Sequence, residues 1–445
     1  MSFFNVKIGV VACILLVGCR QSNMDEIDGI AVIDVVNNLG KYQLIPVSRF
    51  VTGLEYIPLE IGDDCLIGED IRNIIVTTSH IFVAGSNYCY AFDRDGRFTG
   101  RIGSTGQGPG EYQNIVGLSI DEKNQSLYIE TPHTILEYSW DGVFRQSVNK
   151  PKNMIGSLLD NVSFVRDNLF IGHVPNYSGN EPYNFLLFDK FGQVIESFDN
   201  HVKTDRAKPR YMAAAENAMR PYSLSERIYV KENSNDTLYC LNEQNELIPQ
   251  YVFDLGKYVF SNEKRNSTPN VGSFIEAQRV IEEIMSGLIE IPARFTPMVG
   301  APHYIFFSIV AHGLPKNIPF PQKRVQPVHP PLSGFIRIEM PNTHRVVGIY
   351  DIVHKTTQLL DTDPVSHMQG FINDLDGGLS FWAKDYTSEN ELIDIWQAYE
   401  MKELLTDEYF AAHEIKDAQA HQKLKELLKI LKDDDNPVIV IGKLK

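Results

Sequence analysis

Short groups of apolar side chains recur along the chain at intervals typical of propeller blades. Each group places an Ile or Leu, an aromatic residue and an aliphatic residue in succession. The close copies are 81–83, 127–129, 169–171 and 228–230, and looser copies are 305–307 and 379–381. A self-similar pattern of this kind predicts a β-propeller, in which each repeat forms one four-stranded blade.

A second pattern follows these groups and marks tight turns. An aromatic residue or Leu is followed by Asp, Asn or Ser, two variable residues, and then Gly or Asn. The clearest copy is 92–96; 138–142, 188–192 and 241–245 repeat it, and a degraded copy opens at Tyr350. Asp and Asn cap a turn with their side chains, and Gly or Asn tolerates the positive φ that the turn requires. The pattern therefore predicts strand, turn and strand in every repeat.

We accordingly predict an all-β fold, a six-bladed β-propeller of four-stranded antiparallel blades over residues 51–445. The expected blades are 71–102, 115–148, 162–198, 222–253, 302–360 and a sixth from about Gly370. Residues 55–59 and the apolar run 438–441 both read as strands near the two ends of the chain. We expect both in the sixth blade, because joining the ends closes the ring and pairs exposed strand edges.

Two helices and one loop are expected to interrupt the blades. Ser273 and Glu276 have capping-box spacing at the start of a helix over about 271–289. A second helix is expected over about 406–432, where several Leu side chains share one face. Either helix could pack on the propeller or dock a partner. The Pro-rich segment 311–344 predicts a loop and is a candidate lid.

The first 18 residues predict a signal peptide. Lys7 precedes an apolar run, 8–17, that is too short to span a bilayer as a stable anchor. The run ends in Leu-Val-Gly-Cys, which resembles a bacterial lipobox with Cys19 as the lipid acceptor. Residues 19–50 would then form a tether and a lead-in to the propeller. An ordinary signal peptide with an incidental Cys is the alternative.

Charge and cysteine content narrow the function classes. The chain has 41 Lys and Arg against 57 Asp and Glu, a formal charge of −16, which argues against nucleic-acid binding. No apolar segment long enough for a transmembrane helix follows the signal. Cys65, Cys89 and Cys240 remain in the mature domain without any Cys-x-x-Cys pair, which argues against a zinc site or a disulfide framework. Whether two of them form one disulfide stays open.

One segment carries a family resemblance. The Gly-Gln-Gly-Pro-Gly-Glu-Tyr stretch at 106–112 and the chain end from 435 to 445 resemble the six-bladed β-propeller lipoproteins of Gram-negative, Bacteroidota-type bacteria, which are distantly similar to NHL-repeat propellers. The resemblance implies a propeller in the cell envelope, on the outer membrane and facing the periplasm or the surface. It implies a binding or accessory role, sometimes alongside glycan uptake, and it supplies no established catalytic residues.

The sequence contains no recognisable catalytic constellation. It lacks a Gly-x-Ser-x-Gly elbow, a His-Glu-x-x-His pair and a calcium-binding EF-hand loop, and we predict neither a cofactor nor a metal site. Long polar loops should gather on one face, where amides and aromatic rings suit a glycan or a peptide. The candidate ligand-binding residues are Arg101, Glu111, Tyr177, Asn180, Glu181, Tyr183, Arg206, Arg210, Tyr211 and Arg220. Arg101 and Glu111 could instead pair within their own loop.

We therefore expect a lipid-anchored, non-catalytic envelope propeller that binds a glycan, a peptide or a protein partner on its loop-rich face. Two other functions stay open. An envelope enzyme of the lactonase, lyase or glycosidase type would use carboxylates or a metal near the ring axis. A structural or signalling component would dock a partner on the helix at 406–432.

Overall fold

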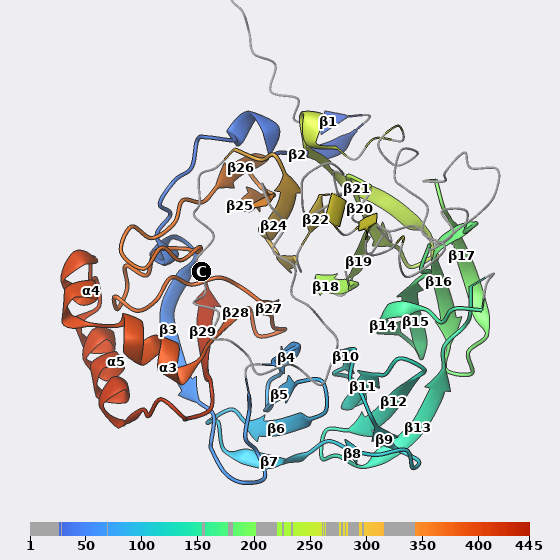
Figure 1. The fold of residues 1–445 in the computed structure, drawn as a ribbon, viewed down its shortest axis with the longest axis horizontal. Helices are drawn as coiled ribbons and strands as arrows, with labels where there is room; N and C mark the ends of the chain where they lie inside the picture. Colours follow the sequence, from blue (N-terminus) through green and yellow to red (C-terminus); the bar gives the residue numbers. More distant parts are fainter. Residues whose placement is uncertain are drawn as a thin grey trace, which may run out of the picture.

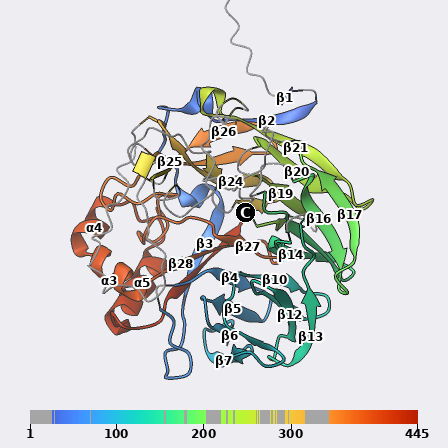
Figure 2. The ribbon, with the colours of Figure 1, turned by 45° about the vertical axis from the view of Figure 1, so that its right-hand side comes forward.

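The computed structural model describes residues 26–445 except 28, 69, 154–155, 177–180, 202–219, 225–226, 233–234, 260, 262, 264–275, 277–278, 281, 284–292, 296–297 and 316–342. Six β-sheets stand around one axis as the blades of a propeller (Figures 1 and 2). The predicted fold class is confirmed.

The first three blades are regular antiparallel sheets in chain order. Blade 1 comprises β4 (Asn73–Val76), β5 (His80–Ala84), β6 (Cys89–Asp93) and β7 (Phe98–Arg101). Blade 2 comprises β10 (Gly117–Asp121), β11 (Ser126–Glu130), β12 (Thr134–Ser139) and β13 (Phe144–Asn149). Blade 3 comprises β14 (Asp160–Arg166), β15 (Leu169–His173), β16 (Tyr183–Asp189) and β17 (Val194–Asp199).

The other blades carry additions or join distant parts of the chain. Blade 4 comprises β18 (Tyr222–Leu224), β19 (Arg227–Lys231), β20 (Thr237–Leu241) and β21 (Leu247–Asp254). Blade 5 comprises β22 (Arg294–Phe295), β23 (Val299–Ala301), β24 (Tyr304–His312), β25 (Thr343–Asp351) and β26 (Thr356–Leu359). Blade 6 comprises β27 (Asp385–Tyr386), β28 (Glu391–Trp396), β29 (Val438–Leu444) and β3 (Val51–Pro58). A two-stranded ribbon, β8 (Ser104–Thr105) with β9 (Glu111–Tyr112), lies between blades 1 and 2.

Blade 6 contains strands from both ends of the chain. The strand β29 lies between β28 and β3, and Ile439 pairs with Ile57 on one side and Ile395 on the other. The looser apolar copy at 379–381 is not the second strand of this blade, as the pattern suggested. That strand is β28, and 379–381 instead makes a single bridge between Phe371 and Phe381.

The helical predictions differ from the structure in detail. The segment predicted as one helix over 406–432 contains α4 (Asp407–Ala412) and α5 (Ala418–Ile430), and α3 (Ala398–Leu404) precedes them. All three lie between β28 and β29. Within 271–289, the few described residues are helical, and most of this prediction lies outside the described part of the chain. Strands β24 and β25 occupy both ends of the loop predicted over 311–344, whose centre is also outside the description.

Residues 26–50 form a strap that the sequence did not predict. The strands β1 (Glu26–Ile27) and β2 (Ile30–Asp34) extend blade 4 on its outer side, with β2 parallel to β21. The strap then contacts blade 5, where Gln43 bridges Leu360, and the lead-in to blade 6, where Pro46 bridges Ile372. It therefore connects the outer sides of three successive blades before β3 begins.

Apolar side chains fill the space between neighbouring blades. Between blades 1 and 2, for example, Phe82 packs with Leu127, Ile129 and Tyr138, all of them buried. Full burial of one such side chain stabilises the fold by roughly 1.5–3 kcal/mol. The recurring apolar triplets thus hold the ring together through contacts between blades.

The connections between strands define two faces of the ring. On one face lie the links from the second to the third strand of each blade and the links from each outermost strand to the next blade. We call this the connection face. Among the described residues it carries α3, α4 and α5 and the segments 131–133, 150–153, 156–159, 174–176, 181–182, 200–201, 220–221 and 360–384. No helix among the described residues is long and apolar enough to cross a membrane.

Candidate functional site

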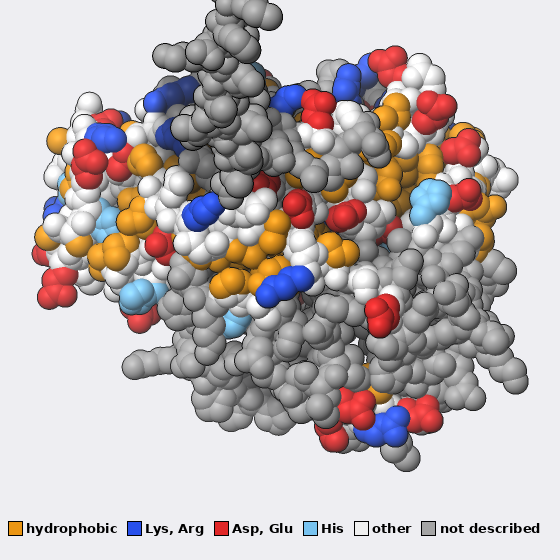
Figure 3. Space-filling view, turned by 90° about the horizontal axis from the view of Figure 1, so that it is seen from above, with side chains coloured by type: hydrophobic (Ala, Val, Ile, Leu, Met, Phe, Trp, Pro, Cys, Tyr) orange, Lys and Arg blue, Asp and Glu red, His pale blue; other side chains and the backbone are white. Residues whose placement is uncertain are grey.

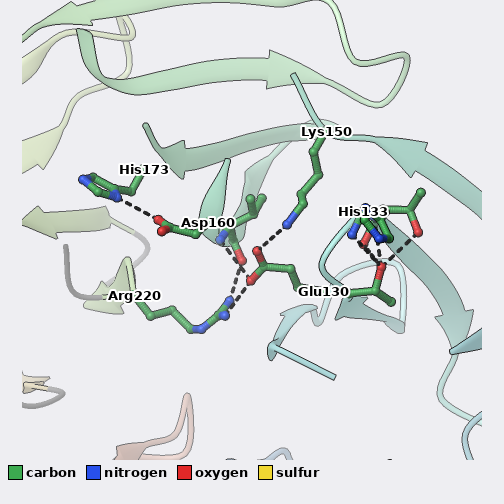
Figure 4. Close-up of polar contacts among 9 residues, drawn as sticks. Glu130, His133, Lys150, Asp160, His173 and Arg220 are labelled. Carbon is green, nitrogen blue, oxygen red and sulfur yellow. Dashed lines mark hydrogen bonds and ion pairs between the residues drawn. The ribbon is translucent and has the colours of Figure 1, made fainter. Parts of the chain in front are cut away.

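A buried ion cluster lies beneath the connection face where blades 2, 3 and 4 meet (Figure 4). Its centre is Glu130, the last residue of β11. Two cations pair with its carboxylate. Lys150 Nζ lies 3.0 Å from Oε1, and Arg220 Nη2 lies 2.5 Å from Oε2. The backbone amide of Val162 donates to Oε2 as well, at 3.1 Å. We call Glu130, Lys150, Arg220 and this amide the Glu130 cluster.

The Glu130 cluster ties three blades together. Lys150 follows the last strand of blade 2, Val162 belongs to the first strand of blade 3, and Arg220 precedes the first strand of blade 4. Arg220 Nη1 also donates to the carbonyl of Val162 at 2.6 Å. The side chains of Glu130 and Lys150 are each only 2% exposed, so the charges depend on one another for compensation.

A glycine makes room for this arrangement. Gly117 lies opposite Glu130 in the pairing of β10 with β11. A Cβ atom on Gly117 would lie 1.9 Å from the Arg220 guanidinium, so any side chain there would displace Arg220. The innermost strand of blade 2 therefore begins with the residue that allows an arginine from blade 4 to reach the carboxylate.

A second polar pair lies beside the cluster, at the start of blade 3 (Figure 4). His173 Nδ1 is 2.7 Å from Asp160 Oδ1, with His173 buried and Asp160 partly exposed. Asn161 has a positive φ of 50° and the β14–β15 register shifts between Asp160 and Ser163. A bulge of this kind redirects side chains, and it turns Asp160 toward the histidine.

A buried carboxyl of different character lies in blade 6. Asp376 Oδ1 accepts hydrogen bonds from Tyr56 Oη, Asn373 Nδ2 and the Gly378 amide, at 3.0, 2.7 and 2.9 Å. Asp376 Oδ2 is buried and has no hydrogen-bond partner among the residues that the structure describes. Burial raises the pKa of Asp376, and the hydrogen bonds from Gly378, Tyr56 and Asn373 offset this effect only in part. We call these four residues the Asp376 cluster.

The Asp376 cluster lies beside contacts that dock the helices. His413 Nε2 lies 2.6 Å from Asp363 Oδ2, and His421 Nδ1 lies 2.7 Å from the carbonyl of Asp376. Lys416 Nζ pairs with Asp374 Oδ2 at 2.6 Å. Burial alone would raise the pKa of Asp374, but hydrogen bonds from Lys416 and Ser48 outweigh it and lower the pKa. The pKa values of two neighbouring carboxyls in this segment are thus shifted in opposite directions.

Two more titratable groups are unusual. Lys231 Nζ donates to the carbonyls of Glu232 and Asn235 and lies 3.9 Å from the centre of the Phe295 ring. Burial lowers the pKa of Lys231 to about 7. Asp385, on the innermost strand of blade 6, keeps part of its surface open, yet desolvation by surrounding protein raises its pKa to about 7.

The predicted residues of the Gly-rich link between blades 1 and 2 do not pair with each other. Arg101 Nη2 donates to Tyr90 Oη at 3.2 Å, and its guanidinium stacks over the same ring. Glu111 Oε2 accepts from the Gly108 amide at 2.7 Å and fills the space that a side chain at Gly106 would need. Glu111 therefore closes its own loop, and Arg101 is held by Tyr90.

The remaining predicted residues are described only in part. Arg220 lies in the Glu130 cluster. Glu181 is buried, and its amide and carbonyl bond to Asn176 Oδ1 and Asn200 Nδ2. Tyr183 is exposed at the start of β16. The described part of the chain does not include Cys19, Tyr177, Asn180, Arg206, Arg210 and Tyr211.

The sequence interpretation missed Glu130, Lys150 and Asp376. A signal for the first existed, because Glu130 directly follows the apolar triplet 127–129. The equivalent position is Ala84 in blade 1, Gly172 in blade 3 and Lys231 in blade 4. Aligning the repeats would have shown that two of these four blades place a charge where the others have a small residue.

Neither cysteine chemistry nor a metal centre emerges from the described residues. Cys65, Cys89 and Cys240 are buried free thiols, so these three form no disulfide with one another. Within the described ranges, no three His, Cys, Asp or Glu side chains are grouped so that they could hold a metal ion.

Comparison with known families assigns the chain. A family model described as a domain of unknown function, DUF4934, matches residues 30–443. The chain belongs to the DUF4934 family. No curated protein matches this DUF4934 chain.

Solved structures confirm the fold. A Bacteroides fragilis protein described as a candidate exported protein matches with a TM-score of 0.61 and 15% identity, over 93% of this DUF4934 chain and 100% of the other. A Bacteroides caccae protein of unknown function gives 0.30 and 11%, covering 63% and 78% of the two chains. Virginiamycin B lyase from Staphylococcus aureus gives 0.33 and 9%, covering 71% and 90%. The last two scores are too low to support an argument. The family and the first match confirm the expected relationship to six-bladed propellers of Bacteroides-type bacteria.

Proposed function

We propose that this protein is a lipid-anchored envelope propeller that binds a glycan on its connection face, in the region of blades 2 to 4. The observation that supports this function is the Glu130 cluster. It holds Lys150, which follows the last strand of blade 2, and Arg220, which precedes blade 4, on Glu130 beneath the connection face. Binding residues are commonly placed on loops that a rigid scaffold positions, and a satisfied buried polar network supplies that rigidity.

The polar groups of this region suit a sugar better than a charged ligand. In the Glu130 cluster, Lys150 and Arg220 already pair with the Glu130 carboxylate. These charges therefore compensate one another and are not left over to bind a charged ligand. On the same face, Tyr183 exposes an aromatic ring at the start of β16, and Asn153 and Asp160 are partly exposed between blades 2 and 3. An aromatic face together with amide and carboxylate groups is the usual composition of a carbohydrate site. A peptide or an envelope protein partner is the outcome to consider if sugars fail.

A glycan array probed with the mature protein tests the proposal, followed by calorimetry on any glycan that binds. Tyr183→Ala should weaken binding, since it removes the exposed ring on the connection face. Phe191→Ala is the matched control, because Phe191 is 71% exposed on the opposite face and should leave binding unchanged. Equal losses in both variants, or no binding to any glycan, would overturn the proposal.

The membrane anchor belongs to the same proposal. Cys19 would carry the lipid, and the propeller would sit on the outer membrane, facing the periplasm or the cell surface. Mass spectrometry of the protein from a host that processes lipoproteins should find acyl chains on Cys19. Cys19→Ser should move the protein from the membrane fraction to the soluble fraction.

One observation favours a second candidate function, an envelope enzyme of the lactonase, lyase or glycosidase type. Asp385 lies on an innermost strand, partly exposed, with a pKa of about 7. A carboxyl group with such a pKa can exchange a proton near neutral pH, as general acid–base catalysis requires. Turnover of any such substrate by the native protein, lost in Asp385→Asn, would favour the enzyme over the binding protein.

A further inference from the structure

We propose that the propeller stands on the rim formed by blades 4 and 5, with this rim against the lipid surface and the connection face open to the side. The inference rests on the lipid anchor proposed above and adds the orientation of the molecule on the membrane. It follows from where the strap places the first described strand and from the length of chain before it.

The strand β1 marks the rim from which the anchor would extend. It is the outermost strand of the blade 4 sheet, because β2 already lies outside β21 and β1 pairs with the outer side of β2. Glu26 Oε1 forms an ion pair at 2.6 Å with Lys355 Nζ, in the turn between the last two strands of blade 5. The start of the described chain is thus attached to the rim of both blades, far from the ring axis (Figure 1).

The chain between the anchor and β1 is short. Six residues separate Cys19 from Glu26. Even fully extended, that length spans only about 25 Å. A lipid on Cys19 therefore keeps the rim of blades 4 and 5 close to the bilayer, and the opposite rim cannot approach the bilayer at the same time.

The composition of this rim is compatible with a lipid surface. Figure 3 looks onto it and shows hydrophobic side chains gathered near its centre, with both basic and acidic side chains beside them. Leu44 in the strap and Val353 in the blade 5 turn are exposed by 52% and 62%. Exposed aliphatic side chains next to lysines are suited to the interface between headgroups and acyl chains.

The test compares two exposed valines on opposite sides of the ring. Val353 lies in the turn of blade 5 next to Lys355, and Val143 occupies the corresponding turn of blade 2, three blades away. They are 62% and 60% exposed. The lipidated mature protein with Val353→Cys or Val143→Cys is labelled with a donor dye, since Cys65, Cys89 and Cys240 are buried. It is then reconstituted into phosphatidylcholine–phosphatidylethanolamine vesicles that carry a headgroup acceptor.

Energy transfer should be at least about twofold higher at position 353 than at 143, because the tether holds only the first rim within about 25 Å of the lipid. A flexible insert of about 20 Gly and Ser residues after Asp25 should remove most of this difference by lengthening the tether. Equal transfer at both positions without the insert, or more transfer at 143, would overturn the orientation while leaving the anchor intact. A protein whose Cys19 carries no lipid by mass spectrometry would overturn the anchor itself, and the orientation with it.

Discussion

Glu130 and Asp376 are both buried carboxyl groups on the connection face, and the protein stabilises them in opposite ways. Glu130 has a cation on each oxygen, drawn from blades 2 and 4. Asp376 has three neutral donors on one oxygen and no partner from the described part of the chain on the other, and burial raises its pKa. The first carboxylate joins blades through charge. The second joins β3 and the link before blade 6 through hydrogen bonds that survive protonation.

The difference shows what each junction requires. Ion pairs at the Glu130 cluster fix three separate blades around one point, and losing any member leaves another buried charge without a partner. The Asp376 cluster joins β3 to the link before blade 6 through neutral hydrogen-bond donors. Burying a negative charge on Asp376 costs free energy. We therefore expect the protein to be more sensitive to replacement of Glu130 than to replacement of Asp376, and we expect the contribution of Asp376 to change with pH.

The largest expected effect is at Glu130. Glu130→Gln leaves Lys150 and Arg220 without a full counter-charge, which should lower the free energy of unfolding by about 3–5 kcal/mol. Urea unfolding followed by circular dichroism measures it. Replacing Glu130 and Lys150 together by Met should recover part of the loss, whereas additive losses would contradict the charge explanation. Glu122→Gln, an exposed turn residue on the other face, is the neutral control.

Lys231 sharpens the comparison, because it is a buried cation that donates to two backbone carbonyls, those of Glu232 and Asn235. The pKa of Lys231 is about 7 in the folded protein, below the ordinary value of 10.5. Between these two pH values the unfolded chain binds more protons than the folded protein. The free energy of unfolding should therefore rise with pH from about 7 to 10.5. Lys231→Met should stabilise the protein by a few kcal/mol near pH 6, with the gain shrinking toward pH 10. Thermal unfolding at several pH values checks this, and a gain independent of pH would refute it.

Gly117 offers a way to disturb the Glu130 cluster without removing a charge. Gly117→Ala should push the Arg220 guanidinium away from Glu130 while Lys150 stays in place. The expected loss is smaller than for Glu130→Gln, about 1–3 kcal/mol, and similar to that of Arg220→Gln. Gly100→Ala is the control, since no atom lies within 4 Å of the added methyl group there. Combining Gly117→Ala with Arg220→Gln should cost little more than either variant alone. Additive losses of stability would mean that Gly117 does not act through Arg220.

The smallest effects are expected at Asp376 and its neighbour Asp374, and their signs should be opposite. The raised pKa of Asp376 means that the folded protein binds this proton more tightly, so its contribution grows as the pH falls toward about 4. Asp376→Asn should change stability at pH 7 by less than about 1 kcal/mol and should remove that gain. The lowered pKa of Asp374 gives a contribution that is present at neutral pH and is lost in acid. Asp374→Asn should therefore destabilise the protein at pH 7 and have little effect at the lowest pH.

Much of the fold could be predicted because its determinants are local. In blades 1 to 4 the turn pattern begins 9 to 17 residues after the triplet ends, and the two patterns located these blades closely. Blade 6 was harder, because its second strand reads Glu-Leu-Ile-Asp-Ile-Trp and contains a buried Asp394. The strap was missed for a similar reason. The residues that β2 pairs with lie more than 200 positions away in β21, so no local pattern signals the contact.

For the candidate site, the sequence predicted which face of the propeller carries it but not which residues form it. Of the residues chosen from composition, Arg220 reached the central cluster, and Arg101 and Glu111 turned out to stabilise their own surroundings. Polar residues in a loop look alike in a sequence whether they bind a ligand, cap a turn or pair with a distant charge. Which of these occurs depends on what the next blade presents.

By itself, the sequence determined the number of blades, the turns within them and the strands near each chain end, since side-chain alternation and turn chemistry act over a few residues. Only the tertiary structure decided which buried charges meet. Lys150, Val162 and Arg220 lie 20, 32 and 90 residues from Glu130, and the ring brings all three to one carboxylate. Charge compensation in a protein interior depends on distances of a few ångströms, and those distances are set by how the blades pack.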